Sequence, residues 1–204
     1  VNLHKGEQKA MSEILKIGTS AGGARPKAVI AFNKKTGEVR SGQTIAPKGF
    51  EYWLLKLDGV SDAQFGSSNG FGRVEYAYYL MARDCKIQMM DCELLEENGR
   101  AHFMTKRFDR EGNGIKHHIQ TFCGIQHFDY NNLYGYSYEQ LFQTMRTLKM
   151  TYPEAEQLFR RMVFNVMATN FDDHTKNFSF RLRQNGKWEL SPAYDVCYSY
   201  DSTN

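Results

Sequence analysis

The sequence predicts an α+β fold of two lobes, a small sheet-rich lobe followed by a mainly helical one. Segments rich in aliphatic and aromatic residues, separated by Gly and Asn turns, fill the chain up to residue 108. Beyond that point apolar residues recur at helical spacing, and two capping-box patterns open helices. With 204 residues, the chain is long enough for one domain of two lobes whose core needs no disulfide or metal.

Composition and charge exclude several classes of protein. Hydrophobic residues make up 41% of the chain and charged residues 24%, a globular mixture that excludes a disordered or collagen-like chain. The net charge of +3 gives no reason to expect direct binding to nucleic acid. No apolar run approaches the roughly 18 residues of a membrane span, so no membrane partner is expected. The four cysteines form no C-x-x-C pair, which argues against a zinc site and indicates a reducing, cytoplasmic setting.

The sheet-rich lobe is expected to span residues 1–106. An Asn-Gly pair at 98–99 favours a tight hairpin turn between its last two strands. Apolar residues at helical spacing predict one helix, over residues 74–83. Strands are predicted over residues 28–32, 52–57, 87–95 and 102–108.

The helical lobe is expected to span residues 107–204. Ser137 followed by Gln140 opens one helix, and Thr151 followed by Glu154 opens the next, which ends at Asn170. A short hairpin follows, with strands over residues 178–182 and 188–190. The second helix carries an apolar stripe that is expected to pack in the core, formed by Leu158, Phe159, Met162, Val163, Val166 and Met167.

The loop between that helix and the hairpin carries the strongest chemical pattern. Asp172 and Asn177 have the D-x4-N spacing of the protein-kinase catalytic loop, in which the aspartate deprotonates a hydroxyl and the asparagine supplies an oxygen to magnesium. Asp195 follows after one hairpin, where kinases place a second magnesium ligand, and hard oxygens suit Mg²⁺. A polar turn that caps the next element, with His174 as a structural histidine, is the alternative.

Three features of the sheet-rich lobe could contact phosphates. Paired glycines at 22–23 let backbone N–H groups approach an anion, although the stretch is neither a Walker A motif nor G-x-G-x-x-G, and a surface turn is the alternative. Lys56 lies in an apolar strand, where it either meets an anion or faces water from an edge strand. Glu75 is its natural partner, or else a first-turn acid that interacts with the helix dipole.

Together these segments resemble the HipA family of serine/threonine kinases, best known as toxins of type II toxin–antitoxin systems. The resemblance extends from about Gly18 to Asp195 and implies a protein-kinase-like fold, truncated at both ends relative to full-length members. Near His118 the family usually shows H-x-E-D or H-Q-E-D, whereas this chain reads His-Ile-Gln-Thr. The matching segments are 20–27, 75–82, 107–110, 172–179 and 190–195, together with Lys56.

The resemblance also implies cofactors and residue roles. ATP and Mg²⁺ are the expected cofactors, with Asp172 as catalytic base and Asn177 and Asp195 as metal ligands. Ser20 matches the serine that many members autophosphorylate, and a phosphate there would repel ATP and inhibit the kinase. The nucleotide would be held by the phosphate-covering loop, the sheet lysine and its partner, the adenine hinge and the catalytic loop: Gly22, Gly23, Ala24, Arg25, Lys27, Lys56, Glu75, Lys106, Arg107, Phe108, His174, Lys176 and Tyr194.

The resemblance favours a protein kinase, and two other classes stay open. A toxin of this family would phosphorylate a protein such as an aminoacyl-tRNA synthetase, and a helix-turn-helix antitoxin would connect it to DNA indirectly. The first alternative is a nucleotide-binding corepressor without turnover, against which the intact Asp172, Asn177 and Asp195 argue. The second is a lipid or small-molecule kinase, to which a net charge of +3 gives little support.

Overall fold

The computed structural model describes residue 14 and residues 26–61, 64–111, 114–129, 132 and 135–200. The chain divides into two compact units, Val1–Tyr76 with Asp91–Ile115 and Ala77–Met90 with Lys116–Asn204. The first unit is built on antiparallel strands, and the described helices other than the start of α2 (Phe71–Asp84) belong to the second. The predicted α+β class is thereby confirmed, whereas the lobe boundary at residue 106 stays a prediction.

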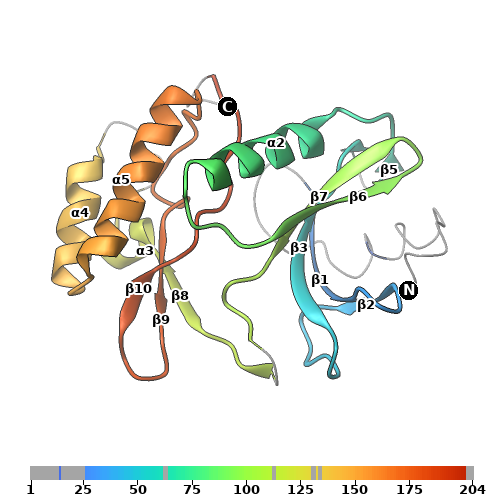
Figure 1. Ribbon diagram of the computed structural model, residues 1–204, viewed down its shortest axis with the longest axis horizontal. Coiled ribbons are helices and arrows are strands. Elements are labelled where there is room, and N and C mark those ends of the chain that lie inside the picture. The colour runs from blue at the N-terminus through green and yellow to red at the C-terminus, as the bar shows by residue number, and fades with distance from the viewer. Residues whose placement is uncertain are drawn as a thin grey trace. The chain divides into compact units, whose positions relative to one another are not determined.

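The first unit is built on a five-stranded antiparallel sheet with strand order β2-β1-β3-β7-β6 (Figure 1). Tight turns connect β1 to β2 and β6 to β7, the second through Asn98 and Gly99, both at positive φ, as the Asn-Gly pair predicts. The five strands are β1 (Lys27–Asn33), β2 (Glu38–Ser41), β3 (Glu51–Lys56), β6 (Cys92–Glu97) and β7 (Arg100–Lys106), and a separate pair is formed by β4 (Val60–Ser61) and β5 (Gln64–Phe65).

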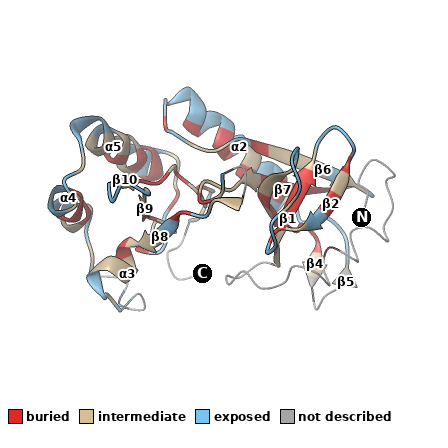
Figure 2. Ribbon diagram, turned by 90° about the horizontal axis from the view of Figure 1, so that it is seen from below, coloured by how far each residue is buried: buried red, intermediate tan, exposed pale blue. Residues whose placement is uncertain are grey.

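The core of this unit lies on one face of the sheet. Trp53 and Leu55 of β3 are fully buried there together with Ile30 of β1. Red in Figure 2 marks buried residues on the labelled strands of this sheet. Side chains alternate along a strand, so Lys56 lies on the face opposite Leu55. The first turn of α2 packs closely against β7, since a Cβ built at Gly72 would lie 1.9 Å from the Ala101 carbonyl oxygen.

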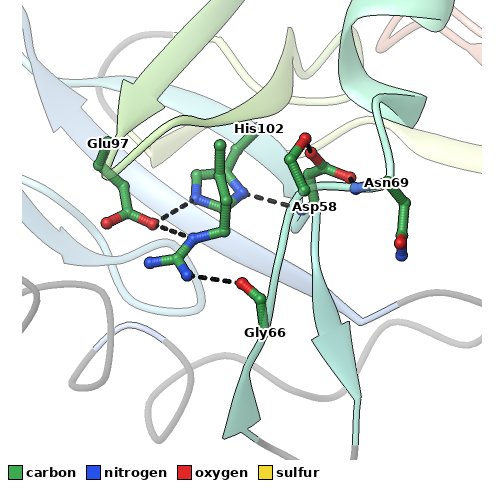
Figure 3. Close-up of polar contacts among 7 residues, drawn as sticks. Asp58, Gly66, Asn69, Glu97 and His102 are labelled. Carbon is green, nitrogen blue, oxygen red and sulfur yellow. Dashed lines mark hydrogen bonds and ion pairs between the residues drawn. The ribbon is translucent and has the colours of Figure 1, made fainter.

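A buried polar network joins the β6–β7 hairpin to the segment that precedes α2 (Figure 3). His102 is 0% exposed, and its Nδ1 accepts a hydrogen bond from the Asp58 backbone N–H at 2.8 Å. Because Nδ1 accepts, the ring is neutral, and its Nε2–H donates to Glu97 Oε1 at 3.1 Å. Glu97 Oε1 also accepts from Arg100 Nε at 2.5 Å, and Asp58 Oδ1 accepts from the Asn69 N–H at 3.1 Å.

We expect this network to lose stability as the pH falls below about 6.5. Burial lowers the pKa of His102 from its ordinary 6.5, although the bond to Glu97 partly opposes the shift. The unfolded chain therefore binds a proton at a higher pH than the folded chain, and the free energy of unfolding falls by up to about 1.4 kcal/mol per pH unit down to the folded pKa. Urea denaturation at pH 7.5 and pH 5.5 measures this loss.

The variant His102→Asn tests whether this histidine is responsible. Asparagine keeps an acceptor for the Asp58 N–H but does not titrate, so the variant should be less stable at both pH values and show a smaller loss between them. His118→Asn changes an exposed histidine of the second unit and should keep the full loss. An equal loss in the wild type and in His102→Asn would show that another group titrates.

The second unit packs helices around a small three-stranded sheet of order β10-β9-β8. Both capping boxes open helices as predicted: Ser137 Oγ accepts from the Gln140 N–H at 3.3 Å, and Glu154 accepts from the Thr151 N–H at 2.8 Å. The elements are α3 (Phe122–Gln126), α4 (Tyr138–Thr147), α5 (Tyr152–Met167), β8 (His118–Thr121), β9 (Ser179–Leu182) and β10 (Trp188–Leu190).

The predicted core stripe of α5 is largely wrong. Leu158 is buried as expected, but Phe159, Val163, Val166 and Met167 are between 42% and 80% exposed. The buried face instead carries two polar residues beside its apolar ones: Leu158, Arg161, Phe164 and Asn165. The prediction failed because helical periodicity identifies apolar positions without showing where buried polar side chains find hydrogen-bond partners.

Other differences concern short elements. The strand predicted over residues 87–95 begins at Cys92, because the preceding residues leave α2 through a turn in which Lys86 has a φ of 61°. The strands β4, β5 and β8 and the short helix α3 were not predicted, since each is too short to show a periodic pattern. Across the described residues, no helix has the length and hydrophobicity needed to cross a bilayer.

Candidate active site

The candidate catalytic loop follows α5 directly and is fixed at its entrance. Thr169 takes a left-handed conformation, with a φ of 54°, which ends the helical path and turns the chain into the loop. Asn170 is buried, and its N–H donates to the Asn165 carbonyl of α5 at 2.8 Å. Ser199 also holds the start of the loop. Its N–H donates to the Thr169 carbonyl and its carbonyl accepts from the Phe171 N–H, both at 3.0 Å.

The loop is fixed at its exit by α3. The N–H groups at the start of a helix lack partners within the helix. Here two of them donate hydrogen bonds to carbonyl groups of the loop. Phe122 N–H donates to the Phe178 carbonyl at 2.8 Å, and Cys123 N–H donates to the Thr175 carbonyl at 3.1 Å. Both ends of the loop are thus attached to regular elements of the second unit.

Within the loop, Asp172, His174 and Asn177 lie close together. Asn177 Nδ2 donates to the Asp172 backbone carbonyl at 2.6 Å, which spans the D-x4-N spacing. His174 Nδ1 accepts from the Lys176 N–H at 3.3 Å, so its proton is on Nε2, which lies 3.5 Å from Asp172 Oδ1. The Asp172 side chain is 40% exposed, so its carboxylate, beside His174, is open to solvent.

A chain of side chains supports the next loop residue, Asp173. The Tyr138 hydroxyl donates to its carboxylate, and Asn165 Nδ2 donates to the Tyr138 oxygen at 3.0 Å. Asn170 Nδ2 in turn donates to Asn165 Oδ1 at 3.0 Å. Burial raises the pKa of Tyr138, and Asp173 raises it further, so the hydroxyl stays protonated and keeps donating. Tyr138 and Asn165 lie outside the loop, and neither they nor Asn170 were predicted as site residues.

The segment that carries Asp195 is held by α5 and by the first residue of β9. Arg161 Nη2 donates to the Ser191 carbonyl at 2.6 Å, and the Ser179 and Ser191 hydroxyls lie 3.0 Å apart. Burial lowers the pKa of the Arg161 guanidinium to about 10, which still leaves it charged at neutral pH. The Tyr194 hydroxyl donates to the Lys176 carbonyl at 2.7 Å and so ties this segment to the catalytic loop.

The arrangement fits a magnesium ion. Asn177, Asp195 and Asp173 line one cavity of about 20 Å³, which is room for about one water molecule or ion. Because Asn177 Nδ2 is engaged by the Asp172 carbonyl, its side-chain oxygen is the atom that remains as a ligand. Among the described residues no group of three His, Cys, Asp or Glu side chains could hold a metal alone. Magnesium at phosphate sites takes one or two carboxylates and completes its shell with water and phosphate.

In the first unit, the structure brings Lys56 and Glu75 together as a buried ion pair. Their side chains are 9% and 4% exposed, and Lys56 Nζ also lies 5.7 Å from the centre of the Phe103 ring. Lys56 ends β3, the middle strand of the sheet, so the edge-strand alternative is wrong. Cys92 lies nearby as a neutral thiol, because burial raises its pKa to about 12.

The predicted adenine hinge follows the end of β7 at Lys106. Its first two N–H groups already form hydrogen bonds within the first unit. The Lys106 N–H donates to the Asp91 carbonyl at 2.9 Å, and the Arg107 N–H donates to the Tyr52 carbonyl at 2.8 Å. The Arg107 guanidinium binds Asp109 through two hydrogen bonds of 2.8 and 2.6 Å. Adenine recognition at this hinge would therefore depend on carbonyl groups or on the chain from Phe108 onward.

The remaining predicted site residues are only partly covered by the structure. Lys27 begins β1 and lies opposite Lys56 in the register of β1 and β3. The predicted autophosphorylation site and most of the phosphate-covering loop lie outside the described residues: Ser20, Gly22, Gly23, Ala24 and Arg25.

The fold and these side-chain groups define a class of protein, those with a protein-kinase-like fold. Within that class, the chain belongs to the family of HipA-like C-terminal domains, whose model matches residues 19–204. The family membership inferred from the sequence motifs is therefore confirmed.

Two solved structures share this fold. One is HipA of the Shewanella oneidensis MR-1 toxin–antitoxin system, which was solved with HipB and its operator DNA. It matches this chain with a TM-score of 0.68 and 18% sequence identity, and the match covers 90% of this chain and 44% of the HipA chain. The Helicobacter pylori proinflammatory kinase CtkA has a TM-score of 0.51 and 14% identity over 89% of this chain and 56% of its own. This chain thus spans less than two thirds of either protein. No curated protein sequence matches it.

Proposed function

We propose that this chain is the kinase region of an ATP- and Mg²⁺-dependent serine/threonine protein kinase, with lobes of residues 1–106 and 107–204. The observation that carries the proposal is the geometry of the catalytic loop. Asn177 is fixed through the Asp172 carbonyl and shares a cavity of about 20 Å³ with Asp195. This leaves the Asp172 carboxylate exposed for an acceptor hydroxyl while the magnesium ligands lie together.

Each residue group has a distinct task in the proposed reaction. Asp172 would accept the proton of the acceptor hydroxyl, and His174 would orient its carboxylate through the Nε2–H. Magnesium held by Asn177 and Asp195 would neutralise charge on the phosphates. Lys56, held in place by Glu75, would contact the phosphates as a fixed cation. Catalysis would then rest on positioning and charge neutralisation, which needs few reactive side chains.

The proposal extends to substrate, partner and regulation. A toxin of this family would phosphorylate a translation component such as an aminoacyl-tRNA synthetase in the cytoplasm. The Shewanella oneidensis HipA was solved with HipB and its operator DNA, which supports the proposal of an antitoxin partner for this chain. That partner would contact DNA, and this chain would be connected to DNA only through it. Phosphorylation at Ser20 would add negative charge to the loop proposed to cover the ATP phosphates and would thereby inhibit the kinase.

Mass spectrometry of the full chain after incubation with ATP and Mg²⁺ tests the proposal. A gain of one phosphate mapped to Ser20, or transfer to an added serine peptide, is expected in the wild type. Transfer should cease when EDTA removes the metal. Nucleotide binding by calorimetry without any transfer would overturn the kinase assignment and favour a binding module.

We expect Asp195→Asn to raise the Mg²⁺ concentration that gives half-maximal transfer by about tenfold. The amide keeps the shape of the side chain but removes one of the negative charges that line the cavity, and a hard cation binds more weakly to a neutral oxygen. Titration of Mg²⁺ at saturating ATP measures the shift. Asp91→Asn changes an exposed acid of the first unit and is the matched control. An unchanged Mg²⁺ dependence in Asp195→Asn would exclude it as a ligand.

A further inference from the structure

Two cavities flank the catalytic loop within the second unit. The small one contains Asn177 and Asp195, the proposed magnesium ligands. The other has a volume of about 150 Å³, and Asp172 lies in its wall. Asp173 lines both cavities, so the loop lies between them. The larger cavity holds none of the proposed magnesium ligands.

The larger pocket is mainly aromatic, with two aspartates in its wall. Its size decides what it can hold. A cavity of about 150 Å³ takes a benzene-sized group, whereas pockets for small-molecule ligands measure about 300–1,000 Å³. A nucleotide is therefore too large, and a single apolar side chain fits. The lining residues are Phe122, Tyr136, Ser137, Tyr138, Leu141, Phe171, Asp172, Asp173, His174, Thr175 and Phe178.

Thr175 supplies a second, independent observation. The residue is 6% exposed, lines the larger pocket, and its hydroxyl oxygen is buried without a hydrogen-bond partner among the described residues. A buried polar group without a partner costs about 1–3 kcal/mol. Its backbone carbonyl accepts a hydrogen bond from the Cys123 N–H. The oxygen has almost no exposed surface, so rotation about the Cα–Cβ bond would have to turn it into the pocket before a polar group of a ligand could satisfy it.

We infer that this pocket binds the protein substrate, by taking an apolar side chain next to the phosphorylated serine or threonine. This inference rests on the proposed function and names the recognition element of the same site. The acceptor hydroxyl at Asp172 places a neighbouring side chain against Phe171, a half-exposed residue of the pocket wall. The Thr175 hydroxyl, once turned into the pocket, donates a hydrogen bond to a backbone carbonyl of the substrate. The carboxylates of Asp172 and Asp173 disfavour an acidic side chain at this position.

The test uses the full chain with ATP, Mg²⁺ and a library of synthetic peptides. Each peptide holds one central serine or threonine, and one flanking position at a time is varied. We expect one flanking position to favour Phe, Leu or Met over Asp by about tenfold or more in the rate of phosphate transfer. The peptide with the preferred residue and its alanine counterpart then serve as a substrate pair.

Variants of the pocket wall assign the preference to the pocket. Phe171→Ala truncates a side chain that is 43% exposed, and it should raise the KM of the preferred peptide about tenfold but leave that of the alanine peptide unchanged. Phe159→Ala truncates a similarly exposed ring on α5 that does not line the pocket, and it should change neither KM. Thr175→Val should raise the KM of both peptides without lowering the free energy of unfolding, since no internal hydrogen bond is lost.

The outcomes separate this inference from the proposed function. Normal transfer with no apolar preference at any flanking position would overturn the inference and leave the kinase assignment intact. An apolar preference that Phe171→Ala and Phe159→Ala weaken equally would also overturn the inference and leave the kinase assignment intact. Phosphate gained at Ser20 without transfer to any peptide would overturn the inference alone. No transfer to Ser20 or to any peptide would overturn the proposed function and the inference with it.

Discussion

Replacing Asp172 by asparagine should lower the rate of phosphate transfer by about 10²–10⁴-fold, the usual contribution of a general base. The amide has nearly the same shape but cannot accept the hydroxyl proton. It can still take a hydrogen bond from His174 Nε2, which lies 3.5 Å from Asp172 Oδ1 in the wild type. The backbone carbonyl that orients Asn177 is unaffected, so ATP and Mg²⁺ should bind as before. Initial rates with [γ-³²P]ATP, beside nucleotide binding by calorimetry, measure both effects.

Stability provides the control for this variant. Because the Asp172 side chain is 40% exposed, the substitution should change the free energy of unfolding by no more than about 0.5 kcal/mol. Glu156→Gln removes an acid of similar exposure, 46%, from α5 and should leave the rate of transfer unchanged. If Asp172→Asn transferred phosphate at the wild-type rate, another residue would have to act as the base.

Elements fixed by neighbouring residues could be predicted from the sequence. The helix α4 begins where Ser137 and Gln140 exchange hydrogen bonds, and both residues lie within one turn of the chain. The β6–β7 turn follows from Asn98 and Gly99, because each adopts the positive φ that this hairpin requires. The spacing of Asp172 and Asn177 is likewise local, and a single hydrogen bond spans it.

Features that depend on distant partners could not be predicted. Arg161 and Asn165 face the core of the second unit because their partners, the Ser191 carbonyl and the Tyr138 hydroxyl, come from other elements. A helical pattern of apolar residues carries no signal of such contacts, so the stripe through Val163 was placed on the wrong face. The polar network around His102 was missed for the same reason.

The candidate site also contains residues that the sequence could predict and residues that it could not. Its chemical residues were found because they follow motif spacing, whereas the residues that position them were not. Tyr138 reads in the sequence as an ordinary first-turn residue of α4, yet its hydroxyl holds Asp173. Thr175 reads as a spacer inside the motif, yet it is buried in the wall of the larger pocket. In both cases the role depends on α3 or α4 packing against the loop.

The largest effect on stability is expected from Glu75→Gln. The amide removes the negative charge that compensates the Lys56 ammonium, whose side chain is 9% exposed. Removing one partner of a buried ion pair costs about 3–5 kcal/mol, so urea denaturation should show a loss of that size in the free energy of unfolding. Glu93→Gln breaks the exposed pair of Lys34 and Glu93 in the same sheet and should cost less than about 1 kcal/mol.

A double variant separates the structural part of this pair from its proposed contact with phosphate. In Lys56→Met with Glu75→Leu both charges are gone, and apolar side chains of similar size can fill the space, so most of the stability lost in Glu75→Gln should return. Phosphate transfer should not return with it, because the fixed cation is missing. A loss in Glu75→Gln no larger than in Glu93→Gln would show that solvent reaches Lys56. A double variant that is stable and transfers phosphate normally would show that the pair serves the sheet and α2 alone.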